Sequence, residues 1–162
     1  MQKIITSGWA RELAEAINLA DKKITITALS FLPPRSHKPD EFGKFYSAIM
    51  SAAATGIDTT IILPMPSKEH PATAQNASAA ATLRAIGCTV YLRASRNLLH
   101  AKTAIIDMAE AWVGSGNMTA AAAHHNREVW MLTDDPRAIA ELQAFHQKLI
   151  TESINSESVP PC

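Results

Sequence analysis

A His, a Lys, an Asp and an Asn interrupt the mostly apolar stretch LLHAKTAIIDMAEAWVGSGNMT. His100 and Lys102 are two residues apart, and Asn117 follows a Gly-Ser-Gly sequence that allows a tight turn. Side chains two apart on a strand point to one face, so the imidazole and the ammonium would lie side by side. Burying that pair is costly unless an anion binds there. The stretch therefore predicts an oxyanion or phosphate site with a histidine able to do chemistry.

The spacing of the polar set extends over about thirty positions. Four residues separate Lys102 from Asp107, six more precede the Gly-Ser-Gly-Asn sequence that ends at Asn117, and Glu128 lies eleven positions further on. This pattern resembles the HKD motif of the phospholipase D superfamily, H-x-K-x4-D-x6-G-S-x-N, together with its downstream acidic residue. A softer resemblance covers most of residues 9–150. The chain most resembles the short Nuc-type bacterial endonucleases and the mitochondrial cardiolipin-hydrolase branch.

The resemblance implies a role for each polar residue. His100 would attack phosphorus and form a phosphohistidine that water later hydrolyses. Glu128 would accept the Nδ1–H of an active-site histidine, which leaves Nε2 as the nucleophile. Lys102 and Asn117 would hold the non-bridging oxygens, and Ser115 would add a hydroxyl donor.

Asp107 carries the last letter of the motif but sits five positions beyond Lys102, so a structural role at the strand end is favoured for it. No metal and no cofactor are implied. His124 and His125 raise the alternative of a metal site with Asp107, but no Cys or His follows them at ligand spacing. A serine-hydrolase elbow is absent, because Gly114 and Gly116 flank Ser115 directly.

The implied mechanism needs a second histidine to protonate the leaving oxygen, and the chain has one motif. Relatives with two motifs fold them as two halves about a pseudo-twofold axis. The resemblance to single-motif members therefore implies a homodimer whose active site lies at the two-fold interface, with His100 of each copy at a shared phosphorus.

A nucleic-acid partner must be bound by a local patch, because Lys plus Arg equals Asp plus Glu at 15 each. Arg93 and Arg96 stand just before the motif, and Arg35 and Lys38 lie in a proline-rich loop. These four are candidate contacts for substrate phosphates.

Both cysteines stand alone, without metal spacing or a disulfide pattern, which fits a reducing setting. The first twenty residues are broken by charges, with no secretory signal, and no apolar run reaches membrane-spanning length. A cytoplasmic protein without a stable membrane anchor is expected.

The remaining sequence predicts the elements that position these residues. Helices are expected at about residues 8–20, from Asp40 to about Thr55, up to about Ile86, and from Pro136. Strands are expected at Lys23–Phe31, 57–64, Cys88–Arg93, 100–107 paired with 111–115, and Arg127–Thr133. The fold class is α/β: one mixed sheet flanked by helices on both faces, phospholipase D-like, in a single domain over residues 1–153. Residues 154–162 are expected to form a disordered tail.

The resemblance therefore implies a metal-independent phosphodiesterase, with an endonuclease that hydrolyses DNA, ahead of RNA, as the favoured form. The first alternative is a hydrolase of phospholipids such as cardiolipin, against which stands the absence of a basic amphipathic helix. The second alternative is a non-catalytic nucleic-acid-binding dimer, which would have no need of a nucleophile.

Overall fold

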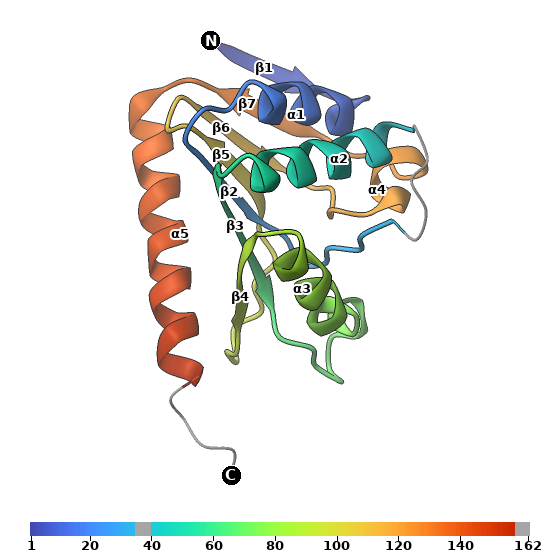
Figure 1. Cartoon of the computed structure of the whole chain (residues 1–162), viewed down its shortest axis with the longest axis vertical. Helices are drawn as coiled ribbons and strands as arrows, with labels where there is room; N and C mark the ends of the chain where they lie inside the picture. Colours follow the sequence, from blue (N-terminus) through green and yellow to red (C-terminus); the bar gives the residue numbers. More distant parts are fainter. Residues whose placement is uncertain (35–39, 158–162) are drawn as a thin grey trace.

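The computed structural model describes residues 1–34 and 40–157, with side chains described as far as Ser153. Arg35 and Lys38, expected to contact substrate, therefore lie outside the described residues. The described strands form a seven-stranded sheet in the order β1-β7-β6-β5-β2-β3-β4 (Figure 1). Their bounds are β1 Gln2–Ile5, β2 Lys23–Thr27, β3 Asp58–Pro64, β4 Thr89–Arg93, β5 Lys102–Ile106, β6 Glu110–Gly114 and β7 Trp130–Thr133.

The sheet is mixed, as expected. β2, β3 and β4 are parallel, and the pairs β2–β5, β5–β6, β6–β7 and β1–β7 are antiparallel. The helices are α1 Trp9–Asn18, α2 Glu41–Ala54, α3 Asn76–Ala85, α4 Ala120–His124 and α5 Pro136–Glu157, with a 3-10 turn at Pro71–Thr73. None of these described helices is long and apolar enough to cross a membrane.

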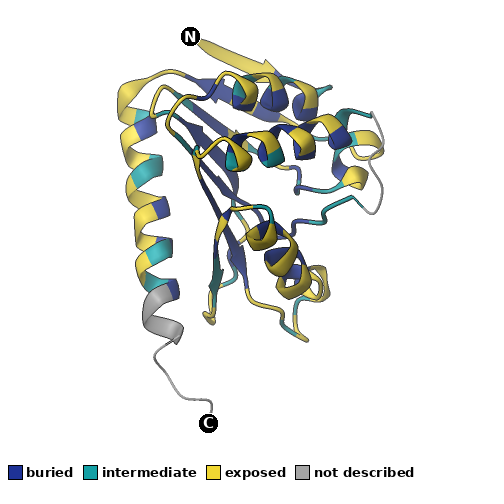
Figure 2. Cartoon of the chain, viewed as in Figure 1, coloured by how far each residue is buried: buried dark blue, intermediate teal, exposed yellow. Residues whose placement is uncertain are grey.

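Helices cover both faces of the sheet because the central strands are apolar on both sides. Ile61 and Leu63 of β3 belong to the main core with α1, α2 and α3, whereas Ile62 packs with Leu149 of α5 on the opposite face. Successive strand residues point to opposite faces, so one continuous apolar run serves both layers. Figure 1 shows α5 apart from the other helices, and Figure 2 shows the central strands buried along their length.

Helix ends follow the local signals in the sequence. Asp40 caps α2, since its carboxylate accepts a hydrogen bond of 2.8 Å from the backbone N–H of Gly43. Gly56 and Gly87 follow α2 and α3 with φ of 87° and 99°, a conformation that glycine adopts without strain. α5 continues to Glu157, which extends the helix into the segment expected as a tail.

Two elements differ from expectation. The sequence pattern predicts no strand at β1, whose residues are mostly exposed and pair at the edge of the sheet with β7. It also predicts no helix at α4, a short helix capped by Thr119. Both elements are short, and neither shows the periodicity that identifies longer ones.

The strands are also shorter than expected at one edge of the sheet. The expected strand 23–31 ends at Thr27, the strand 100–107 begins only at Lys102, and the strand 127–133 begins only at Trp130. The ladder between β5 and β6 ends at the pair Lys102–Gly114, so residues before it have no strand partner. His100 therefore precedes β5, and the argument from two residues on one strand face does not apply to it.

Candidate active site

One edge of the sheet gathers the residues of the motif. Because β5 is antiparallel to β2 and β6, its first residue lies beside the carboxyl ends of both strands. Lys102 pairs with Gly114, and Gly114 pairs with Trp130 of β7, so three strands are in register at this edge. We call this edge, where β2, β3, β4 and β6 end and β5 and β7 begin, the site edge. Ligands of open α/β sheets commonly bind at such an edge.

His100 and Lys102 are in direct contact at the site edge. The Nζ of Lys102 lies 3.0 Å from Nδ1 and 3.2 Å from Nε2 of His100, and it donates to the carbonyl oxygen of His100 at 2.7 Å. His100 is exposed, whereas Lys102 is only 5% exposed. The imidazole is thus accessible from solvent, and the ammonium that contacts it is buried.

Two features of its surroundings shift the pKa of Lys102 in opposite directions. Burial lowers the pKa of Lys102, because desolvation disfavours the ammonium form, while the carboxylate of Glu128 acts to raise it. A buried cation with an acid nearby suits a site that receives the negative charge of a phosphodiester.

Asn117 is oriented by the strand that ends next to it. Its Oδ1 accepts a hydrogen bond of 3.3 Å from the backbone N–H of Ser30, and Met118 donates to the carbonyl of Ser30 at 3.1 Å. Among the described residues, none accepts a hydrogen bond from its Nδ2, so those donors are available to an anion.

Ser115 and Glu128 form a hydrogen-bonded pair. The Oγ of Ser115 donates to Oε2 of Glu128 at 2.5 Å and accepts from the backbone N–H of Val129 at 3.0 Å. Asn126 donates to Oε1 of Glu128 at 3.0 Å. Within one chain, the two described donors to Glu128 are therefore Ser115 and Asn126, and His100 is not among them.

Glycine is required at position 114 by a neighbouring ring. A Cβ there would lie 2.1 Å from the indole of Trp130, far inside van der Waals contact. That indole also stacks on Trp9 with ring centroids 4.9 Å apart. A tight turn is what the Gly-Ser-Gly sequence predicts, and Gly114 in addition makes room for the protein's own core.

Asp107 lies at the opposite end of β5 from the other motif residues. Its carboxylate accepts three backbone hydrogen bonds, from Asp21, Lys22 and Lys23, at 2.7–2.8 Å. Burial acts to raise the pKa of Asp107, but these three donors outweigh it, and the net pKa is lowered. Asp107 and Met108 both have positive φ, at 53° and 57°, and form the turn between β5 and β6. These contacts are structural.

Of the two described basic candidates, Arg93 is bound to other residues and Arg96 is exposed. Arg93 is held by the protein: Nε lies 2.6 Å from Oε2 of Glu152, and Nη1 donates to the carbonyl of Asn97 at 2.7 Å. A phosphate could engage Arg93 only in competition with these groups. Arg96 is exposed three residues further on. It is the better placed of the two to meet a substrate.

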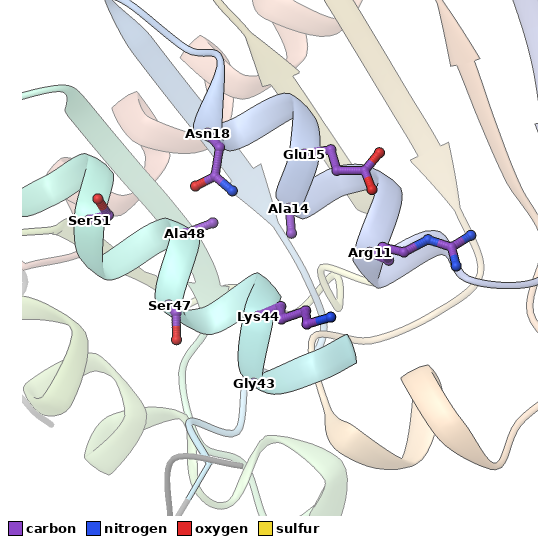
Figure 3. Close-up of a pocket in the computed structure, with 9 residues that line it drawn as sticks. All are labelled: Arg11, Ala14, Glu15, Asn18, Gly43, Lys44, Ser47, Ala48 and Ser51. Carbon is purple, nitrogen blue, oxygen red and sulfur yellow. The ribbon is translucent and has the colours of Figure 1, made fainter. Parts of the chain in front are cut away.

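Two cavities differ in their relation to the motif. One of about 290 Å³ lies at the carboxyl ends of β3 and β4, and its wall includes Arg93, Arg96 and Leu99, next to His100. Another of about 550 Å³ lies between α1 and α2, where Arg11, Glu15 and Lys44 extend from the two helices (Figure 3). No motif residue lines the second cavity, so only the first adjoins the candidate site.

Among the described residues, no three His, Cys, Asp or Glu side chains lie close enough together to hold a metal ion. His124 ends α4, and its Nε2 lies 3.4 Å from Oδ1 of Asp40. His124 therefore joins α4 to the start of α2.

The residues that orient the motif from outside it carry little signal in the sequence. Asn126 could have been noticed, because it lies two positions before Glu128. No local signal points to the N–H of Ser30 or to the α5 residues near β5, because their partners are 43 to 87 positions away in the chain.

Comparison with known proteins gives a consistent result at the level of family. A family model described as "Cardiolipin synthase, PLD-like domain" matches residues 13–150. Cardiolipin synthase A of Pseudomonas aeruginosa is 28% identical over 141 residues, which cover 86% of this chain and 27% of that protein. The chain thus spans about a quarter of the length of the curated relatives that it matches.

Two solved structures share the fold over almost the whole of both chains. Nuc from Salmonella typhimurium, a phospholipase D family member, has a TM-score of 0.74 and 21% identity, covering 94% of this chain and 96% of its own. NucT from Helicobacter pylori has a TM-score of 0.70 and 22% identity, with the same coverage of both chains.

Proposed function

The chain belongs to the family of phospholipase D-like domains, and from this premise we propose that it is a phosphodiesterase that uses His100 as its nucleophile. The observation that carries the proposal is the contact of His100 with the buried Lys102, with Asn117 and the Ser115–Glu128 pair at the same edge of the sheet. This set offers a nucleophile, a cation and oriented donors within one site.

The reaction follows from these groups. A ring nitrogen of His100 bonds to phosphorus while the bond from phosphorus to the leaving oxygen breaks, and a second histidine gives that oxygen its proton. Water then attacks phosphorus, loses a proton to the second histidine, and releases His100. Lys102 and Asn117 stabilise the non-bridging oxygens, where negative charge increases in the transition state, and Ser115 joins them if its hydroxyl turns away from Glu128. Lys102 leaves the imidazole for the phosphate when substrate binds.

The second histidine is His100 of another copy, so the active form is a homodimer with a shared site. An exposed apolar face near the site edge supports this contact. Ile4, Met131 and Val113 are exposed and lie in one register across β1, β7 and β6, and Val129 is exposed next to Glu128. A second copy that covered this face would bury apolar surface beside the catalytic residues.

DNA is the substrate that we favour, as in the Nuc-type endonucleases that the sequence resembles. Arg96 stands exposed on the wall of the cavity next to His100, where it could meet a neighbouring phosphate. The similarity to cardiolipin synthase A favours a second candidate, hydrolysis of a phospholipid. The cytoplasmic location expected from the sequence stays a prediction.

One assay separates these functions. Purified protein in excess EDTA is incubated with single- and double-stranded DNA, with RNA, and with cardiolipin-containing vesicles. Cleavage of DNA supports the proposal, and cleavage of lipid alone moves the assignment to the second candidate. DNA that shifts on a gel without being cut indicates the binding dimer. Activity that requires a divalent ion contradicts the metal-independent mechanism.

A further inference from the structure

His100 belongs to a segment that has no helix or strand to hold it. Residues 94–101 join β4 to β5, and most of them are exposed. We call them the β4–β5 segment. A nucleophile on such a segment needs ties from elsewhere, because a displacement of about 1 Å costs roughly 100-fold in rate. Figure 1 shows α5 alongside β4, and the ties come from this helix.

The first tie is ionic and lies at the start of the segment. Glu152 of α5 meets Nε of Arg93 at 2.6 Å, and the same guanidinium donates through Nη1 to the carbonyl of Asn97 at 2.7 Å. Arg93 is 10% exposed and Glu152 35% exposed, so water reaches the pair only in part. One planar cation thus links α5 to the backbone of the segment, three residues before His100.

The second tie is apolar and lies directly before His100. Leu99 packs with Leu149 of α5 and with Ile62 of β3, and Ala101 packs against this cluster. Leu99 is buried although both flanking positions are not. The backbone on either side of His100 is therefore anchored to the α5 face of the sheet.

The third tie is a buried chain of hydrogen bonds after His100. Nε2 of His146 lies 2.8 Å from Oγ1 of Thr103, and that oxygen lies 2.8 Å from Oγ1 of Thr27. Thr27 donates to the carbonyl of Ala101 at 3.5 Å, the longest and weakest link.

Each hydroxyl has one proton, so the bond from Thr27 to the carbonyl of Ala101 sets the direction of these hydrogen bonds. With that proton committed, Thr103 donates to Thr27, and the Nε2–H of His146 donates to Thr103. Nδ1 of His146 then carries a bare lone pair, in agreement with its being buried without a partner among the described residues. Burial lowers the pKa of His146 to about 4, which keeps the ring neutral, as this series of hydrogen bonds requires.

His146, Leu149 and Glu152 recur every three residues on α5 and so lie along one stripe of the helix. We infer that these three are positioning residues: they hold the β4–β5 segment from both ends and thereby set the place of His100 at the site. Their contacts are with Arg93, Thr103, Ile62 and Leu99 rather than the motif residues, so we do not count them as catalytic. The inference rests on the proposed function for its effect on rate, whereas its effect on the segment can be measured without any activity.

Glu152→Ala is the main test, because alanine keeps the helix and the position is partly exposed. Glu141→Ala is the matched control, an exposed carboxylate about three turns earlier on α5. Thr103→Val removes the hydroxyl of the buried chain with little change in side-chain size. Cleavage of bis(4-nitrophenyl) phosphate gives kcat and KM, thermal unfolding gives Tm, and hydrogen exchange reports on peptides that cover residues 94–101.

Glu152→Ala and Thr103→Val should each lower kcat about tenfold with KM nearly unchanged, because misplacement of the nucleophile affects the chemical step. Hydrogen exchange should rise in the β4–β5 segment and not in β6 or β7, and Glu141→Ala should match the wild type. A Tm that falls while kcat holds would reduce these residues to ordinary structural contacts and overturn the inference.

The two proposals fail in different ways. If Glu152→Ala keeps full kcat while His100→Asn is inactive, the inference is wrong and the proposed function stands. If the wild type cleaves no diester, the proposed function is wrong, and hydrogen exchange alone decides the inference: unchanged exchange in residues 94–101 overturns it.

Discussion

Lys102 combines three conditions that rarely coincide in one side chain. It is buried, its ammonium contacts a candidate nucleophile, and an acid nearby opposes the effect of burial on its pKa. The sequence predicts that His100 and Lys102 lie together, but the strand-face geometry behind that prediction is not the one observed. Their contact arises just before β5 begins, because the ladder ends at Lys102.

Glu128→Gln should move the basic limb of the pH–rate profile to lower pH. The carboxylate acts to raise the pKa of Lys102, so its loss leaves burial unopposed and the pKa falls further. Lys102 then loses its charge at a lower pH, and activity is lost with it. A profile of kcat/KM for both proteins measures the shift. An unmoved basic limb would show that Lys102 does not govern it.

His100→Asn should abolish turnover while the fold and the dimer persist, since His100 is exposed and Asn is smaller. In a symmetric dimer the change removes the nucleophile and the general acid together. Acid-labile phosphate should be trapped on the wild-type chain during turnover and be missing from the variant. Near wild-type cleavage by His100→Asn would mean that this edge of the sheet is not the active site.

The elements followed from the sequence wherever a local signal was strong. Asp40, Gly56 and Gly87 bounded the helices correctly, because capping and positive φ are properties of a few neighbouring residues. At the site edge, the sequence predicts strands that extend beyond the ends seen in the structure. A strand stops where its partner stops, and the partners of β5 come from distant parts of the chain.

Gly114→Ala should destabilise the protein by about 1–3 kcal/mol, because its Cβ would overlap the indole of Trp130. Chemical denaturation of both proteins measures the loss. In a Trp130→Leu background the same substitution should cost less, since the smaller side chain leaves room. An equal cost in both backgrounds would place the clash elsewhere.

His146 gives α5 a pH-dependent contribution to stability. Its folded pKa of about 4 lies below the ordinary 6.5, so the unfolded chain binds the proton more readily between these values. The free energy of unfolding should therefore fall as pH drops from 6.5 towards 4, by at most about 1.4 kcal/mol per pH unit from this group. Denaturation in that range should show a shallower slope for His146→Gln. Equal slopes would assign the effect to other groups.

At the scale of the whole molecule, the sequence suggests a homodimer only because it has one motif and the implied mechanism needs two histidines. The surface that a second copy would cover cannot be identified from the sequence. Met131 and Val113 become neighbours when β7 pairs with β6, and Ile4 joins them only because β1, a strand that the sequence does not predict, pairs with β7.

Sedimentation should give about twice 17.5 kDa at micromolar concentration. Met131→Glu places a charge in the middle of the exposed apolar face and should produce inactive monomers that remain folded. Lys148→Glu, an exposed charge change on α5, is the control and should stay dimeric and active. An active, strictly monomeric enzyme would contradict the shared site.

The exposed β4–β5 segment also divides the chain in a particular way. A cut after Arg96 would leave β1, β2, β3 and β4 on one fragment and β5, β6 and β7 on the other. In the sheet, the three strands of the second fragment lie between β1 and β2 of the first, so neither half can complete a sheet alone. We therefore expect two fragments cut there to be inactive alone and to regain activity when mixed, because reassembly would restore His100 to its place.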